Sequence, residues 1–216
     1  MHAPPTLRGG LRARLVSLVF GLFLCACGIV AFLESGLGLP PWDVLHQGVA
    51  KQLGVSFGAA NLLVSFAVLV LVWALRAHIG IGTILNAALT GTFVILLVAV
   101  DAIAALSEEP LAVRIGLLAA GLVLLGAGTC VYIASSLGAG PRDSLMLVTS
   151  LRLGIRIGVS RTVVEVTALL AGLLLGGTVG IGTLVFAAGI GPAVEASFWL
   201  LGRTPLAAPA VASSAA

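Results

Sequence analysis

Two short motifs that could do chemistry stand one hundred residues apart in this chain, Pro41-Trp42-Asp43 and Pro141-Arg142-Asp143. A proline suits the first turn of a helix because it lacks an N–H, and an acid there complements the positive end of the helix dipole. Capping is therefore one interpretation of both motifs. The other is that two equivalent carboxylates line the two mouths of one pathway. Trp42 is also a candidate for an anchor at a membrane surface.

Several other polar side chains interrupt or flank apolar stretches. His46 follows the first motif by one turn and can titrate near neutral pH, although a surface histidine without a role is the alternative. Glu165 and Glu195 fall within apolar segments, where an acid near a helix centre costs about 2.5–3.5 kcal/mol. Arg161 lies one turn before Glu165 and can pair with it. The candidate residues of a pathway or substrate site are Trp42, Asp43, His46, Asn86, Arg142, Asp143, Arg161, Glu165 and Glu195.

The tetrapeptide Gly-Ile-Gly-Thr occurs at 80–83 and again at 180–183. Its glycines permit a tight turn between antiparallel helices, and its threonine can cap the helix that follows. A bare helix N-terminus can also hold an anion, which is the alternative. The tetrapeptide lacks the third glycine of a dinucleotide-binding loop, so nucleotide binding is not supported. The residues assigned to these structural turns are Gly80, Gly82, Thr83, Gly180, Gly182 and Thr183.

No catalytic set is apparent in the sequence. The three histidines are scattered, no pair of metal ligands shares a helix face, and there is neither a nucleophile elbow nor a phosphate-binding loop. Three cysteines are too few for a disulfide scaffold. We therefore expect a protein that is not an enzyme and that holds no metal or cofactor.

The composition is that of a membrane protein. The chain has 216 residues, of which 60% are hydrophobic and only 9% are charged, whereas a soluble domain carries about 25% charged residues. The expected partner is therefore the lipid bilayer, and no basic run is dense enough for nucleic acid. We expect one membrane domain over residues 1–216, with a disordered tail at 205–216 that is rich in alanine, proline and serine.

A helix needs about 20 mostly apolar residues to cross the bilayer. Six segments satisfy or approach that length, at about 13–33, 58–75, 83–101, 112–134, 160–177 and 183–201. Two further segments, 41–53 and 141–153, are about 20 Å long as helices, which is too short for a hydrocarbon core of about 30 Å. Each of these two could lie in the membrane interface or enter the bilayer as a re-entrant helix.

The second half of the chain repeats the first. Without any gap, about a third of positions 14–94 match positions 114–194. Repeat 1 (about 12–101) and repeat 2 (about 112–201) each hold three predicted spans, and an odd number requires the copies to lie upside down relative to each other. The sequence thus predicts an all-α, polytopic membrane protein of six transmembrane helices, built as two inverted three-helix repeats that each include a short helix. Inverted repeats of this kind build many transporters.

The positive charges give an independent test of this topology. If the N-terminus is cytoplasmic, the inner segments hold nine arginines and the outer segments hold only Lys51 and Arg114. This bias predicts a multi-pass protein with both termini in the cytoplasm. The inner set is Arg8, Arg12, Arg14, Arg76, Arg142, Arg152, Arg156, Arg161 and Arg203. Small-residue pairs at Ala87/Gly91 and Gly172/Gly176 permit close helix contact, either within the bundle or in a homodimer.

The stretch from Gly38 to Gly48, GLPPWDVLHQG, resembles the signature of the YczE/YyaS/YitT group of bacterial integral membrane proteins. The run Gly138-Ala139-Gly140-Pro141-Arg142-Asp143 and the two Gly-Ile-Gly-Thr turns support the resemblance, which covers most of residues 12–202 and is strongest to the YczE branch. It implies a small polytopic protein of the bacterial inner membrane. It brings no substrate and no catalytic residues.

Two functions fit these observations. The first is a small secondary transporter or permease for an unknown small molecule or ion, driven by a gradient because the chain has no ATP-binding motif. The second is a membrane accessory or scaffold protein that uses its repeat for packing. A transporter should enclose a polar cavity where the repeats meet, whereas a scaffold should be tightly packed there with its acids facing the lipid headgroups.

Overall fold

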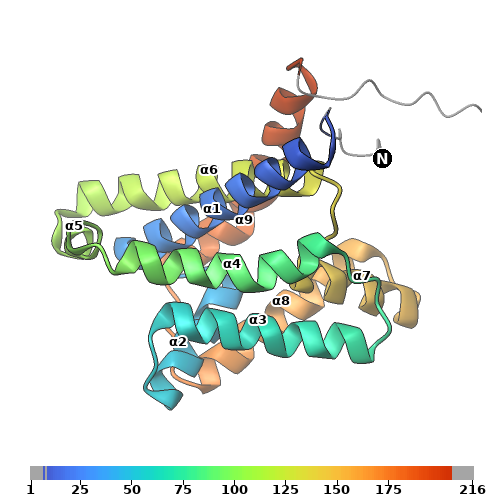
Figure 1. The fold of residues 1–216 in the computed structure, drawn as a ribbon. Coiled ribbons are helices and arrows are strands. Elements are labelled where there is room, and N and C mark those ends of the chain that lie inside the picture. Colours follow the sequence, from blue (N-terminus) through green and yellow to red (C-terminus); the bar gives the residue numbers. More distant parts are fainter. Residues whose placement is uncertain (1–6, 8, 206–216) are drawn as a thin grey trace, which may run out of the picture.

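The computed structural model describes residue 7 and residues 9–205, which form an all-α bundle (Figure 1). Arg8 and residues 206–216 of the predicted tail lie outside the described residues. Two short elements, α5 and the 3-10 helix η1, connect the two parts of the chain. The elements are α1 (Leu11–Ser35), α2 (Pro41–Leu53), α3 (Phe57–Ala74), α4 (Ile81–Val98), α5 (Asp101–Ala104), η1 (Ala105–Glu108), α6 (Leu111–Ala134), α7 (Pro141–Leu153), α8 (Ile157–Leu174) and α9 (Ile181–Gly202).

Four helices of the first part recur one hundred residues later, so that α1 to α4 correspond to α6 to α9. The two short helices begin and end where the sequence predicts. Both α2 and α7 have proline at their first position, where a missing N–H costs nothing. Both end at a glycine in the left-handed region, Gly54 with φ 65° and Gly154 with φ 62°, a conformation that side chains disfavour.

Five helices in the described residues are long and apolar enough to cross a membrane: α1, α3, α4, α6 and α9. These five correspond to five of the six predicted spans. The sixth predicted span, 160–177, corresponds to α8, which has 18 residues like its equivalent α3 but also carries Arg161 and Glu165. The chain is thus a membrane-embedded helical protein, and the crossing by α8 stays a prediction.

The largest contact between the two parts joins α1 and α6, which run antiparallel. A Cβ added at Gly21 would lie 2.9 Å from the carbonyl oxygen of Gly128, and one added at Gly28 would lie 2.9 Å from that of Gly121. Such close backbone approach is possible only where the side chain is hydrogen. These four glycines occupy equivalent positions in the two parts, so each helix presents the same small-residue stripe to the other.

Arginines at equivalent positions cap the far ends of this helix pair. Nε of Arg14 donates to the carbonyl oxygen of Ser135 at 2.6 Å, and Nε of Arg114 donates to that of Ser35 at 2.7 Å. A helix leaves its last carbonyls without partners, and a cation there also opposes the negative end of the dipole. Each part of the chain therefore completes a helix of the other.

The Gly-Ile-Gly-Thr segments make a second reciprocal contact. The predicted turns are confirmed, since α4 begins at Ile81 and α9 at Ile181, and each threonine hydroxyl accepts from the N–H of the first glycine. The N–H of Gly82 donates to the carbonyl oxygen of Leu137, and the N–H of Gly182 donates to that of Leu37, both at 2.8 Å. These N–H groups are thus used within the fold, which leaves the anion-binding alternative without support.

The short helices pack inside the bundle between the parts. The α2 helix packs on α3 and α8, and α7 packs on the same two helices. A Cβ added at Gly172 in α8 would lie 2.5 Å from the backbone nitrogen of Leu45 in α2, so Gly172 serves packing within the bundle. Asp43, an acid in the first turn of α2, is buried. This burial favours the re-entrant interpretation of α2 over an interfacial one.

Candidate functional site

A cavity of about 200 Å³ lies where the two parts of the chain meet. It brings together all the predicted pathway residues except His46 and Glu195, and His46 lies directly behind its wall in contact with Asp43. Glu195 is exposed on α9 and does not line the cavity. The predicted residues in the lining are Trp42, Asp43, Asn86, Arg142, Asp143, Arg161 and Glu165.

Most of the cavity lining comes from positions that correspond in the two parts of the chain. The corresponding pairs are Cys25/Leu125, Ile29/Thr129, Pro40/Gly140, Trp42/Arg142, Asp43/Asp143, Asn86/Phe186 and Thr90/Ile190. The same helix faces therefore form both sides of one chamber, although the side chains differ. Asp43 and Asp143 line this single chamber rather than two separate mouths, because the first turns of α2 and α7 both reach it.

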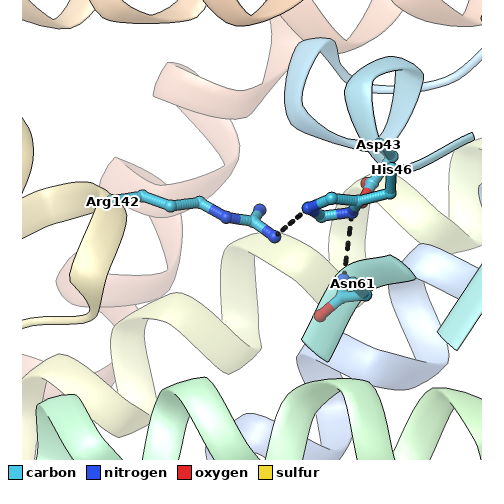
Figure 2. Close-up of polar contacts among 4 residues, drawn as sticks. All are labelled: Asp43, His46, Asn61 and Arg142. Carbon is cyan, nitrogen blue, oxygen red and sulfur yellow. Dashed lines mark hydrogen bonds and ion pairs between the residues drawn. The ribbon is translucent and has the colours of Figure 1, made fainter. Parts of the chain in front are cut away.

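His46 is the centre of a buried polar cluster at this junction (Figure 2). Its Nδ1 lies 2.9 Å from Oδ1 of Asp43, and its Nε2 lies 3.2 Å from Nη2 of Arg142. Nδ2 of Asn61, on α3, lies 3.1 Å from the same Nδ1. The alternative that His46 is a surface histidine is wrong, since His46 is 0% exposed. The reason is the packing of α2 against both α3 and α8, which buries most of its first two turns, including the side of the helix that carries His46.

The partners of His46 determine where its proton lies. A guanidinium has only donors, so Nε2 must accept from Arg142 and Nδ1 must carry the proton that Asp43 accepts. Burial lowers the pKa of His46, Arg142 adds to that effect, and the hydrogen bond to Asp43 opposes it. The ring is therefore neutral at pH 7. A protonated Nδ1 cannot accept from the Asn61 amide nitrogen that faces it, so we assign the Asn61 amide in the flipped orientation, in which its oxygen accepts from the ring N–H.

The remaining charged groups of the cavity have other partners. The hydroxyl of Tyr132 donates to Oδ2 of Asp143. Nε of Arg161 donates to Oε1 of Glu165 at 3.0 Å, which confirms the predicted pairing. Arg142 lies over the ring of Trp42, 5.2 Å from its centroid. Trp42 is itself buried, so it is not an anchor at the membrane surface.

Thr90 and Tyr132 also line the cavity but were not among the predicted site residues. Tyr132 is the one tyrosine of the chain and corresponds to Phe32 in the first part. This added hydroxyl at a repeated aromatic position is the sequence feature that could have identified Tyr132 as a site residue. Within the described part of the chain, the buried Oγ1 of Thr90 has no hydrogen-bond partner. A buried hydroxyl without a partner is costly, and here it faces a space that a solute can fill.

The cavity continues into a wider, mostly apolar hollow of about 680 Å³. The two spaces share Ile133, Asp143, Met146 and Arg161. These residues belong to α6, α7 and α8, so the chamber is hollowed further toward the second part of the chain.

Comparison with known proteins agrees with the fold. Residues 12–197 match a family described as "Family of unknown function (DUF6198)". An uncharacterized protein of Haemophilus influenzae is 38% identical over 189 residues, covering 87% of this chain and 84% of that protein. The uncharacterized membrane protein YczE of Bacillus subtilis is 34% identical, covering 77% of each chain, and YyaS of the same organism is 31% identical, covering 76% of this chain and 82% of its own. No solved structure matches. The chain therefore belongs to the DUF6198 family and is a YczE-like membrane protein, as the stretch from Gly38 to Gly48 predicts.

Proposed function

We propose that this protein is a small secondary transporter with its substrate site in the cavity between the two parts of the chain. The observation that carries the proposal is the chamber itself, which is lined by equivalent positions of both parts and by charged side chains. A scaffold would have no reason to keep a polar chamber at that junction, where the cost of burying charge is high. The accessory or scaffold function therefore fits less well.

The proposal includes six spans arranged as two inverted triplets. Its support is the reciprocity of the contacts: Arg14 reaches Ser135 as Arg114 reaches Ser35, and α1 runs antiparallel to α6. A further pair of equivalent positions also makes reciprocal hydrogen bonds: Gln52 donates to the carbonyl oxygen of Leu175, and Arg152 donates to that of Leu75. Reciprocal contacts of this kind are the signature of a two-fold relation. On this topology α8 crosses the membrane as its equivalent α3 does.

Transport by alternating access requires the chamber to open toward one side at a time. The two parts of the chain differ in how far their equivalent helices expose the side chains near the chamber, as a chamber open to one side requires. Asn61 and Ser65 on α3 are 0% and 5% exposed, whereas the equivalent side chains of Arg161 and Glu165 on α8 are 45% and 22% exposed. The α3 helix packs on α4, but α8 makes no comparable contact with α9 within the described residues. We infer a state that is closed at the α3 side and open at the α8 side.

We propose that the open side faces the cytoplasm of a bacterial inner membrane, because the positive charges gather on that side in this topology. Figure 1 draws the start of α1 and the end of α9 toward the same end of the bundle, as expected if both termini are cytoplasmic. Labelling of single cysteines by a membrane-impermeant maleimide in intact cells tests this orientation. A cysteine placed at Thr204 should be protected until the membrane is opened, and labelling from outside would contradict the assignment.

Flux measurement tests the transport function. Purified protein in liposomes is given panels of ions and small metabolites, with Asp43→Asn and Asp143→Asn as site variants and Glu195→Gln as the matched control, since Glu195 lies outside the cavity. We expect flux with the wild type and the control and reduced flux with the site variants. Unchanged flux in both site variants would remove these carboxylates from the mechanism. An absence of flux for every panel member would overturn the transporter function.

A further inference from the structure

The contact between His46 and Arg142 joins the two parts of the chain at the wall of the cavity (Figure 2). Arg142 on α7 donates to Nε2 of His46 on α2, and both residues are held from behind, His46 by Asp43 and Arg142 by the ring of Trp42. The contact exists only while Nε2 has a free lone pair. A proton on Nε2 would remove the acceptor and place a second positive charge against the guanidinium. Protonation of His46 and its contact with Arg142 therefore exclude each other.

The groups around the ring come from four helices, three of which carry charged side chains. Asp43 belongs to the same helix as His46, and Arg142 belongs to α7. The α3 helix faces the ring with the Asn61 amide and the Phe57 ring, whose centroid is 6.0 Å away. The α8 helix carries Arg161 and Glu165, which line the same cavity and pair with each other. Of these groups only Asp43 and Arg142 act on the ring directly.

Arg142 is the cation of this cavity that lacks an anion. Within the described residues no carboxylate lies within ion-pair distance of it: Asp43 pairs with His46, Asp143 accepts from Tyr132, and Glu165 pairs with Arg161. A guanidinium at the wall of a chamber, with its planar set of donors, suits a carboxylate or another small oxyanion. The buried Thr90 hydroxyl in the same lining has no partner among the residues that the structure describes, and it supplies one more donor.

We propose that a small oxyanion and a proton bind together in this cavity. The oxyanion binds to the guanidinium of Arg142. The proton binds to Nε2 of His46, which Arg142 no longer contacts once it holds the oxyanion. No bond to carbon forms or breaks, and a monoanion with one proton adds no net charge to a site where net charge is costly. The polar chamber alone measures about 200 Å³, which is below the 300–1,000 Å³ typical of sites for drug-sized ligands. The hollow that continues from it is mostly apolar, so the charged part of the ligand has few atoms. The inference takes from the proposed function only that the chamber holds a solute, and it adds the substrate class and the coupling ion.

Proton uptake on anion binding tests the inference without any need for transport. The full-length protein in lipid nanodiscs is placed in weak buffer near pH 7 with a pH indicator, and sodium acetate or sodium nitrate is added, with choline chloride and glucose as controls. We expect one of the oxyanions to bind and to raise the solution pH by the uptake of about one proton per bound anion. By linkage, its affinity should rise by about tenfold for each unit that the pH falls toward the pKa of the histidine. Binding without proton uptake, or binding by neither oxyanion, overturns the proposal.

Variants separate the two roles. Arg142→Gln should abolish oxyanion binding, with Arg142→Lys restoring part of it, and His46→Gln should leave binding that takes up no proton and does not depend on pH. Arg203→Gln is the matched control, because Arg203 stacks on Trp199 outside the cavity. If a variant does not fold, the wild-type proton uptake still decides the question. Proton-linked binding without flux in liposomes would sink the transporter function alone, whereas flux without proton uptake would sink this inference alone.

Discussion

The contact between the start of α9 and the loop after α1 can be tested by one methyl group. An alanine at Gly182 would place its Cβ 2.4 Å from the carbonyl oxygen of Gly38. Both groups belong to backbone, so neither can turn away, and overpacking of this kind costs roughly 1–3 kcal/mol. The movement would also strain the hydrogen bond from Gly182 to Leu37, 2.8 Å long, whose net value is about 0.5–1.5 kcal/mol. Alanine returns up to about 1 kcal/mol through its better helix propensity.

The net effect of Gly182→Ala is a loss of about 2 kcal/mol in the free energy of unfolding. For a chain of this size, that corresponds to a melting temperature lower by roughly 4–8 °C. The assay is thermal melting of the purified protein in detergent, followed by tryptophan fluorescence. Two other glycines make the prediction graded: at Gly82 the added Cβ would lie 2.9 Å from the carbonyl oxygen of Gly138, and at Gly191, also in α9, it would meet nothing within 4 Å.

The expected order of melting temperatures is therefore Gly191→Ala highest, Gly82→Ala intermediate and Gly182→Ala lowest. Gly191→Ala should melt at or above the wild type because it gains helix propensity and meets open space. If Gly182→Ala melts no lower than Gly191→Ala, the two parts of the chain do not dock as closely as described, and the argument from reciprocal contacts fails with it.

Three further outcomes follow from the same structure. Arg114→Gln removes the charged donor to the Ser35 carbonyl, 2.7 Å away, and should lower the melting temperature by roughly 3–6 °C. The melting temperature of Arg114→Lys should lie between those of the wild type and Arg114→Gln, and an unchanged melting temperature in Arg114→Gln would show that water replaces the arginine. Burial holds the pKa of His46 below its ordinary value of 6.5, so the unfolded chain binds this proton more readily than the folded chain. The free energy of unfolding should therefore be full above about pH 6.5 and fall as the pH drops through the lower pKa of the folded state. Chemical denaturation at a series of pH values checks this, and an equal dependence of the free energy of unfolding on pH in His46→Gln would contradict it. Thr90→Val removes a buried hydroxyl without a described partner and should raise the free energy of unfolding by about 1 kcal/mol; a destabilised variant would show that the hydroxyl is satisfied.

Much of the fold follows from local rules. Proline at the first position and a left-handed glycine after the last set the bounds of α2 and α7, and the sequence carries both signals at positions 41, 54, 141 and 154. The apolar lengths predicted the long helices in the same way. These features depend on neighbours along the chain, which is why the sequence alone is sufficient for them.

The site was harder to predict because it depends on which helix packs against which. Motif spacing could select Asp43, Arg142 and Asp143, since each belongs to a repeated motif. The burial of His46 depends on the docking of α2 onto Gly172 of α8, more than one hundred residues away, and no local pattern encodes that pairing. The difference in exposure between Asn61 and Arg161 has a partial sequence signal, since α8 carries Arg161 and Glu165 where α3 carries Asn61 and Ser65. The side chains alone do not predict that α3 packs on α4 while α8 makes no comparable contact with α9 within the described residues.

The arginine caps have a consequence for how the protein is made. The carbonyls that Arg14 caps belong to Ser135 and Ser136, about 120 positions further along the chain. At about 5–20 residues per second, the ribosome needs several seconds or more to supply them after Arg14 has emerged. During that time α1 waits in or near the insertion machinery without α6, its main packing partner. Assembly of the finished bundle must therefore follow the synthesis of α6, and a nascent chain that stops before it would present an unpaired glycine stripe to chaperones and membrane proteases.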